Sequence, residues 1–161
     1  CLQALRLLGE GLPRVKDDPT DLEARLKCLM GAWMSMTGVI TGSRLGASHA
    51  IGHILGGSAG VPHGHTSCIM LPYVLNWNES VNGERQKEVA IAMGRPGVAA
   101  GQVLDEFISG LDMPRRIRDA GVKESDLLRL AENCMLDDWT YSNPREIRSP
   151  EQVMEILRMA Y

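Results

Sequence analysis

The spacing of the apolar residues does most to limit the fold, because it follows the period of an α-helix through nearly the whole chain. Leu2, Leu5 and Leu8 recur three apart at the start, and residues 22 to about 42 form a longer helical segment. No segment shows the convincing polar–apolar alternation of a half-buried strand. The sequence therefore predicts an all-α, multi-helix domain with about eight or nine helices over residues 1–161.

Glycine and proline residues mark the expected ends of several helices. Gly11 and Pro13 predict the end of the first helix. Pro72 lies inside a later apolar segment, where it is expected to kink the helix or leave a carbonyl group free. Ser149 and Pro150 predict the start of a last helix that runs to the end of the chain.

The segment from Leu22 to about Gly42 is predicted to be a long helix in the centre of the fold. From Cys28 onwards its residues are apolar or small nearly all round, which is typical of a buried helix. Small residues in this half would let a neighbouring helix approach closely. They are Gly31, Ala32, Ser35 and Gly38. Candidate caps for its start are Asp17, Thr20 and Asp21.

Composition excludes several classes of protein. A length of 161 residues with 44% apolar residues is enough for one domain with a real core and argues against disorder. A net charge of −3 without a basic stripe argues against a nucleic-acid partner. The chain has no signal peptide and no apolar run of membrane-spanning length, so we expect a cytoplasmic protein with no membrane partner. The four cysteines form no C-x-x-C pair, which favours reduced thiols over a disulfide or zinc framework.

All four histidines lie between residues 49 and 65. His49 and His53 are four apart, so on a helix they share a face and could bind one metal, or one could bind metal while the other faces the substrate. A glycine-rich break is expected at residues 56–60, before a new helix that starts at a proline. His63 and His65 fall in the first turn of that helix, so the second pair is expected to fold back towards the first.

Around these histidines the sequence resembles the iron-containing (group III) alcohol dehydrogenases. Three further segments, residues 5–13, 21–33 and 142–161, look like the maleylacetate reductase branch of that superfamily. The resemblance therefore covers nearly the whole chain. The residues that carry the central motif are Gly46, His49, Ala50, His53, Leu55 and Gly56, then Pro62, His63 and Gly64, then Leu71, Pro72, Tyr73, Val74 and Asn78.

The resemblance implies a specific site. Members of this family have an N-terminal dinucleotide-binding domain and a C-terminal helical metal-binding domain, and this chain is similar to the second only. Of the family's metal ligands, one Asp and three His, two match His49 and His63, while the others would lie before Cys1. His53 matches a histidine beside the nicotinamide and the substrate, and His65 has no counterpart, so its role stays open. No G-x-G-x-x-G loop occurs, so the dinucleotide-binding domain is expected to be absent from this chain, which looks like the continuation of a longer polypeptide.

The chemistry of alcohol oxidation accounts for these residue types. A divalent metal, Fe²⁺ or Zn²⁺, lowers the pKa of the hydroxyl group, a histidine such as His53 relays the proton, and NAD(P) takes the hydride. Two histidines alone leave a metal under-coordinated. Asp17, Asp18 and Asp21 are conceivable further ligands, although their spacing does not favour them.

The leading hypothesis is therefore an oxidoreductase, the helical part of an enzyme that acts on a small alcohol, aldehyde or oxoacid. We also expect a homo-oligomer. An alternative is a stand-alone binding or oligomerisation module, or a hydrolase that uses Ser48, Ser67 or Cys68 without a cofactor, although no G-x-S-x-G elbow is present. A dehydroquinate synthase-like enzyme is a third possibility.

Overall fold

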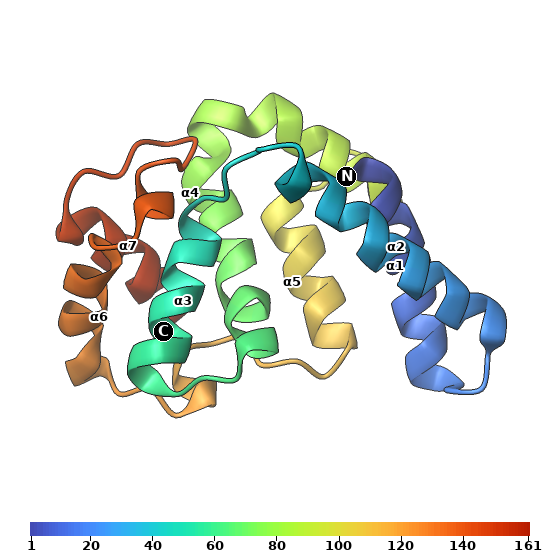
Figure 1. Ribbon diagram of the computed structural model, residues 1–161, viewed down its shortest axis with the longest axis horizontal. Helices are drawn as coiled ribbons and strands as arrows, with labels where there is room; N and C mark the ends of the chain where they lie inside the picture. The colour runs from blue at the N-terminus through green and yellow to red at the C-terminus, as the bar shows by residue number, and fades with distance from the viewer. The chain divides into compact units, whose positions relative to one another are not determined.

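The computed structural model describes residues 1–161 and is helical throughout, without a strand (Figure 1). This confirms the predicted all-α fold class. Seven α-helices and three short 3-10 helices follow one another along the chain. They are α1 (Leu2–Asp17), α2 (Leu22–Ile40), α3 (Ala47–Ala59), α4 (His63–Ala92), α5 (Ala100–Gly110), η1 (Arg118–Ala120), η2 (Glu124–Asp126), α6 (Leu127–Cys134), η3 (Asp138–Thr140) and α7 (Pro150–Ala160).

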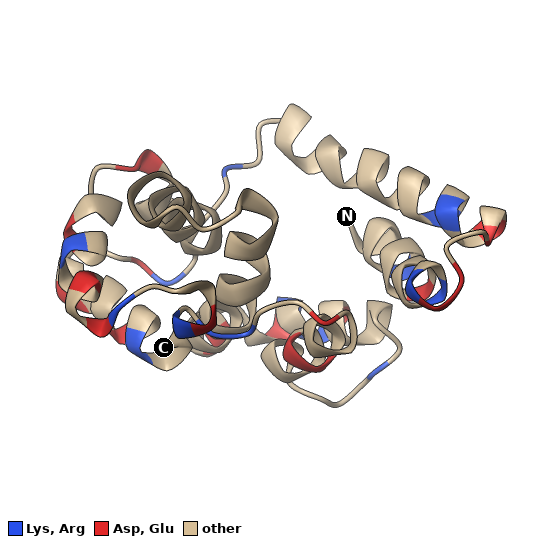
Figure 2. Ribbon diagram, turned by 90° about the horizontal axis from the view of Figure 1, so that it is seen from below, with Lys and Arg blue, Asp and Glu red and all other residues tan.

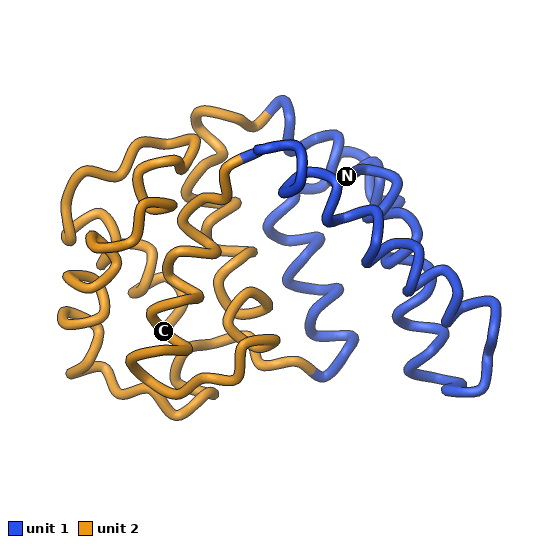
Figure 3. Tube along the Cα trace, viewed as in Figure 1, with its two compact units in different colours: residues 1–43, 84–112 blue, residues 44–83, 113–161 orange.

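The residues form two compact units (Figure 3). Unit 1 comprises residues 1–43 and 84–112, and unit 2 comprises residues 44–83 and 113–161. Helix α4 contributes to both units, and none of the helices is long and apolar enough to cross a bilayer.

Helix α4 changes direction at Asn82, whose backbone angles are not helical (φ −135°, ψ 21°). Pro72 was expected to kink the helix or to leave a carbonyl group free. The helix continues through Pro72, so the kink is not there, whereas a proline inside a helix has no N–H to donate and so agrees with the second alternative. Ile69, Met70 and Val74 are buried on either side of Pro72, so packing of the helix against unit 2 outweighs the one backbone hydrogen bond that a proline removes.

In unit 1, α1 and α2 pack closely through glycines, as the small residues of α2 predicted. A Cβ atom at Gly31 would lie only 2.8 Å from Leu8 Cγ, and one at Gly38 would lie 3.1 Å from Cys1 Sγ. The loop between the helices is fixed by Asp21, whose carboxylate accepts the backbone N–H of Ala24 at 2.9 Å and caps α2.

Two expectations for unit 1 are wrong. Helix α1 does not end at Gly11 and Pro13 but runs on to Asp17, because Gly11 is buried against α2 and this contact holds the helix together beyond the glycine. Helix α2 is not central, since only Ala24 and Gly31 among its residues are buried. Within unit 1, α2 packs extensively against α1, so this face of α2 is covered.

In unit 2, helices α3, α6 and α7 and the first part of α4 enclose the apolar core. Its largest fully buried side chains include Ile51 and Leu55 of α3, Ile69 of α4, and Ile156 and Leu157 of α7. Helix α6 packs against α3, the helix that carries two of the histidines, and α7 packs against α6 (Figure 1). At the start of α7, the Gln152 side chain accepts the backbone N–H of Ser149 at 3.3 Å, so the predicted cap is present.

Candidate functional site

Helix α3 places His49 and His53 on one face. Their ring centroids are 5.0 Å apart and the ring planes meet at 78°. The helix begins at Ala47, whose backbone N–H donates to the side-chain oxygen of Asn143 at 3.2 Å. Asn143 is buried and also exchanges hydrogen bonds with Asn78 of α4, so the start of the histidine helix is fixed from two directions.

His63 lies opposite His49 across the turn between α3 and α4. The expected glycine break at residues 56–60 is shorter than predicted, because α3 continues to Ala59 and only Gly60 leaves the helix, with φ of +70°. A glycine adopts this left-handed conformation at no steric cost, which allows the chain to reverse within a few residues. The rings of His49 and His63 have centroids 6.3 Å apart. His65 is in the same first turn of α4, but its ring is not among those that face His49.

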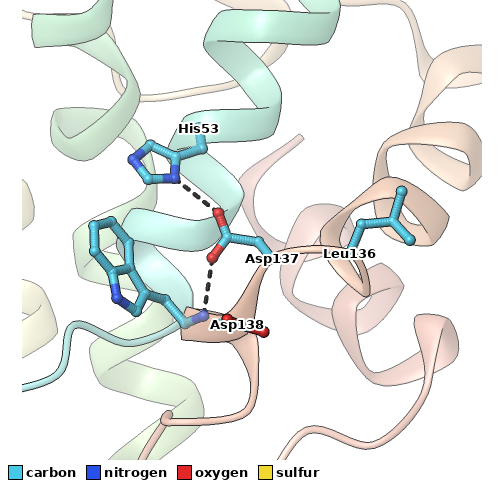
Figure 4. Close-up of a pocket in the computed structure, with 5 residues that line it drawn as sticks. His53, Leu136, Asp137 and Asp138 are labelled. Atoms are coloured by element: carbon cyan, nitrogen blue, oxygen red, sulfur yellow. Dashed lines mark hydrogen bonds and ion pairs between the residues drawn. The ribbon is translucent and has the colours of Figure 1, made fainter.

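Asp137 joins this group from a distant part of the chain. One of its carboxylate oxygens lies 2.7 Å from Nδ1 of His53, and the other accepts the backbone N–H of Trp139 at 2.9 Å (Figure 4). The Asp137 side chain is only 17% exposed, whereas that of His53 is 40% exposed. The hydrogen bond therefore fixes Nδ1 of His53, while part of its side chain stays exposed to solvent.

The indole of Trp139 packs against both histidines of α3. Its centroid is 5.0 Å from the ring of His49 and 4.8 Å from the ring of His53. Beside these rings is an open pocket of about 370 Å³, lined by His53, Leu136, Asp137, Asp138 and Trp139. Sequence reasoning missed Asp137 and Trp139, because no local spacing relates a residue of α3 to a loop 84 positions further along the chain.

Burial lowers the pKa of His49 below its ordinary value of 6.5, and the nearby rings of His53 and His63 lower it further when they are charged. The neutral imidazole is therefore favoured at neutral pH, and it is the form that can bind a metal. Burial also raises the pKa of the Cys68 thiol, which makes it a poorer nucleophile for the hydrolase alternative.

The chain alone does not supply a complete metal site. The imidazoles of His49 and His63 are donors of the type that Fe²⁺ and Zn²⁺ accept, but no group of three or more histidine, cysteine or acidic side chains forms. Two of the acidic residues near the start of α2 are bonded within unit 1. The carboxylate of Asp18 accepts from Thr20, and that of Asp21 accepts from Arg14 and Ala24.

Comparison with known proteins gives the family of this chain. All residues 1–161 match the C-terminal part of the Fe-containing alcohol dehydrogenase family. The chain belongs to this family, and the expected resemblance is confirmed.

The chain is similar to particular enzymes over nearly its whole length. It is 32% identical over 160 residues to Maleylacetate reductase 2 of Cupriavidus pinatubonensis (strain JMP 134 / LMG 1197), covering 99% of this chain and 44% of that protein. It is 35% identical over 176 residues to Dehydrogenase ALT3 of Alternaria alternata, covering 98% and 45%. The structure of an alcohol dehydrogenase from Oenococcus oeni superposes with a TM-score of 0.89 at 30% identity, covering 100% and 44%. The chain thus spans less than half the length of these relatives.

Proposed function

We propose that this chain is the helical catalytic part of an NAD(P)-dependent oxidoreductase that interconverts an alcohol and a carbonyl compound. The observation that carries the proposal is the convergence of His53 and His63 on His49, with Asp137 bonded to His53. Membership of the iron-containing alcohol dehydrogenase family supports it, as do relatives named maleylacetate reductase and alcohol dehydrogenase.

In this proposal His49 and His63 are two of the protein ligands of a divalent metal. The distance between their rings and the lowered pKa of His49 support this role. When bound, Fe²⁺ or Zn²⁺ would lower the pKa of the substrate hydroxyl as a Lewis acid, and NAD(P) would exchange the hydride. The remaining ligands and the dinucleotide-binding residues are contributed by an N-terminal polypeptide of the kind that the longer relatives contain.

His53 is the catalytic acid and base. The hydrogen bond to Asp137 favours the tautomer with its proton on Nδ1, so Nε2 carries the free lone pair. In the oxidation direction, Nε2 accepts the proton of the substrate hydroxyl, and in the reduction direction it returns a proton to the carbonyl oxygen. Asp137 acts as the positioning residue for this ring, and Trp139 limits its rotation by packing against it.

The test is turnover by a fusion of this chain to the upstream part of Maleylacetate reductase 2, supplied with Fe²⁺ or Zn²⁺. Absorbance of NADH and NADPH is followed with maleylacetate and with small alcohols. We expect turnover that falls about 10²–10⁴-fold in His53→Ala, since general acid–base catalysis contributes about that factor. His65→Ala is the matched control, and its rate should stay near that of the unchanged fusion.

A well-folded fusion without any nicotinamide-dependent turnover would contradict the proposal. Hydrolysis of esters by the chain alone, without a nicotinamide and lost in His53→Ala, would favour the hydrolase alternative instead.

A further inference from the structure

Large apolar side chains are exposed mainly on one helix. Of fourteen exposed large hydrophobic residues in the chain, eight lie on α2. No charged residue occurs between Lys27 and Arg44, and Figure 2 shows most of the length of α2 without acidic or basic residues. A continuous apolar surface of this kind marks an interaction site on a protein.

Six of these eight residues form a regular stripe along α2. Their spacing alternates between four and three residues, and their exposure ranges from 49% for Met36 to 79% for Ile40. This is the heptad spacing of a helix that packs along a second helix at a shallow angle. We call this stripe the outer seam, and its members are Leu22, Leu26, Leu29, Trp33, Met36 and Ile40.

The outer seam is distinct from the face of α2 that α1 already covers. That inner face is formed by small residues, with Gly31 against Leu8 and Gly38 against Cys1. Small residues are suited to a close helix pair, whereas the large side chains of the outer seam are suited to interdigitate with a second partner. Helix α2 is therefore patterned for packing against two helices, and this chain supplies one of them.

We propose that the outer seam packs against a helix of the polypeptide that precedes the position of Cys1 in this family. The chain matches the C-terminal part of the family and only 44% of Maleylacetate reductase 2, so the relatives carry a longer upstream part. Cys1 packs against Gly38 on the inner face of α2, so a polypeptide that precedes Cys1 arrives near the C-terminal end of α2, the end that carries Met36 and Ile40 of the outer seam.

The test compares hydrogen exchange in the 161-residue chain and in its fusion to the upstream part of Maleylacetate reductase 2. We expect backbone amides of α2 to exchange at least about tenfold more slowly in the fusion, while those of α6 stay unchanged. Leu29→Glu in the fusion should remove this protection, since it puts a charge into the seam. Leu128→Glu is the matched control, because Leu128 is 57% exposed on α6 and away from the seam.

Two results would overturn the inference. One is α2 exchange that is the same in the chain and in a well-folded fusion. The other is a chain that sediments as a dimer with α2 already protected, and becomes monomeric in Leu29→Glu, because a second copy would then occupy the seam. A second fusion, to the upstream part of the Oenococcus oeni alcohol dehydrogenase, decides the question if the first aggregates.

This inference shares the upstream polypeptide with the proposed function, but the two can fail separately. A fusion with protected α2 and no nicotinamide-dependent turnover contradicts the function alone. A fusion with turnover and unprotected α2 contradicts the seam alone.

Discussion

Helices α2 and α3 are both rich in apolar and small residues, yet they lie in opposite environments. Five residues of α3 are buried, among them Ile51 and Leu55, whereas α2 buries only Ala24 and Gly31. Helix α3 packs against α6 and η3, whereas α2 packs against α1 and leaves a stripe of large apolar side chains exposed. Apolar composition therefore indicates that a helix needs partners, but it does not indicate that the same polypeptide provides them.

The largest difference between the two units should appear in thiol reactivity. Burial raises the pKa of Cys134 in unit 2 from 9.0 to about 12, which lowers its thiolate fraction at neutral pH about a thousandfold, while Cys1 in unit 1 is exposed. Because the pKa is raised, the thiol stays protonated throughout the neutral range. Labelling with a disulfide reagent at pH 7, followed by peptide mass spectrometry, should modify Cys1 rapidly and Cys134 only after unfolding. Rapid labelling of Cys134 in the folded chain would show that the core of unit 2 is open.

The next largest difference between α3 and α2 should be the loss of unfolding free energy when a leucine is truncated to alanine. Leu55→Ala on α3 removes a side chain with 0% exposure and should lower the free energy of unfolding by about 2–5 kcal/mol. Leu29→Ala on α2 removes a side chain that is 70% exposed and should change it by less than about 0.5 kcal/mol. Urea unfolding followed by circular dichroism gives both values. Equal losses would mean that α2 is already covered in the isolated chain.

Glycine substitutions test where helices approach closely. In Gly31→Ala the new methyl group would lie 2.8 Å from Leu8 and 3.2 Å from the Ala4 carbonyl, so we expect a loss of about 1–2 kcal/mol in unfolding free energy. Gly57→Ala on α3 meets no atom within 4 Å, and it should stabilise the chain by about 0.5–1 kcal/mol through helix propensity. The same urea experiment measures both. A gain in Gly31→Ala would contradict the close packing of α1 and α2.

The smallest effect concerns the charge of Asp21 at the start of α2. The hydrogen bond from Ala24 and the Arg14 guanidinium hold the pKa of Asp21 below its usual range. The carboxylate therefore contributes stability above its unfolded-state pKa, and this contribution is lost as pH falls through the folded-state value. Asp21→Asn keeps a capping oxygen but removes the charge. Its melting temperature should lie slightly below that of the unchanged chain at pH 7, and the gap should close at low pH. A gap that widens on acidification would contradict this role.

The sequence was informative where the relevant contacts are local. His49 and His53 share a helix face by their spacing alone, and a nearby glycine and proline predicted the turn that brings His63 to them. Their roles as ligands and catalyst are still predictions. The helical period also predicted the all-α class, because periodicity depends only on neighbouring residues.

Contacts between distant segments could not be predicted. Asp137 and Trp139 reach the histidines through the packing of α6 against α3, and no spacing within either segment encodes that approach. The same limit explains the wrong helix end at Pro13 and the kink that does not occur at Pro72. Local rules end or kink a helix at proline, whereas tertiary packing kept both helices continuous.

The side chain of Asn143 connects three segments around the histidines by hydrogen bonds. Its one side chain holds the first backbone amide of α3, the amide group of Asn78 on α4 and the carbonyl of Arg145 in the loop before α7. The two helices that carry the histidines and the loop before α7 are therefore all bonded to the same side chain. We therefore expect Asn143→Ala, although it changes none of the histidines, to remove these hydrogen bonds together and to alter the distances between the histidine rings.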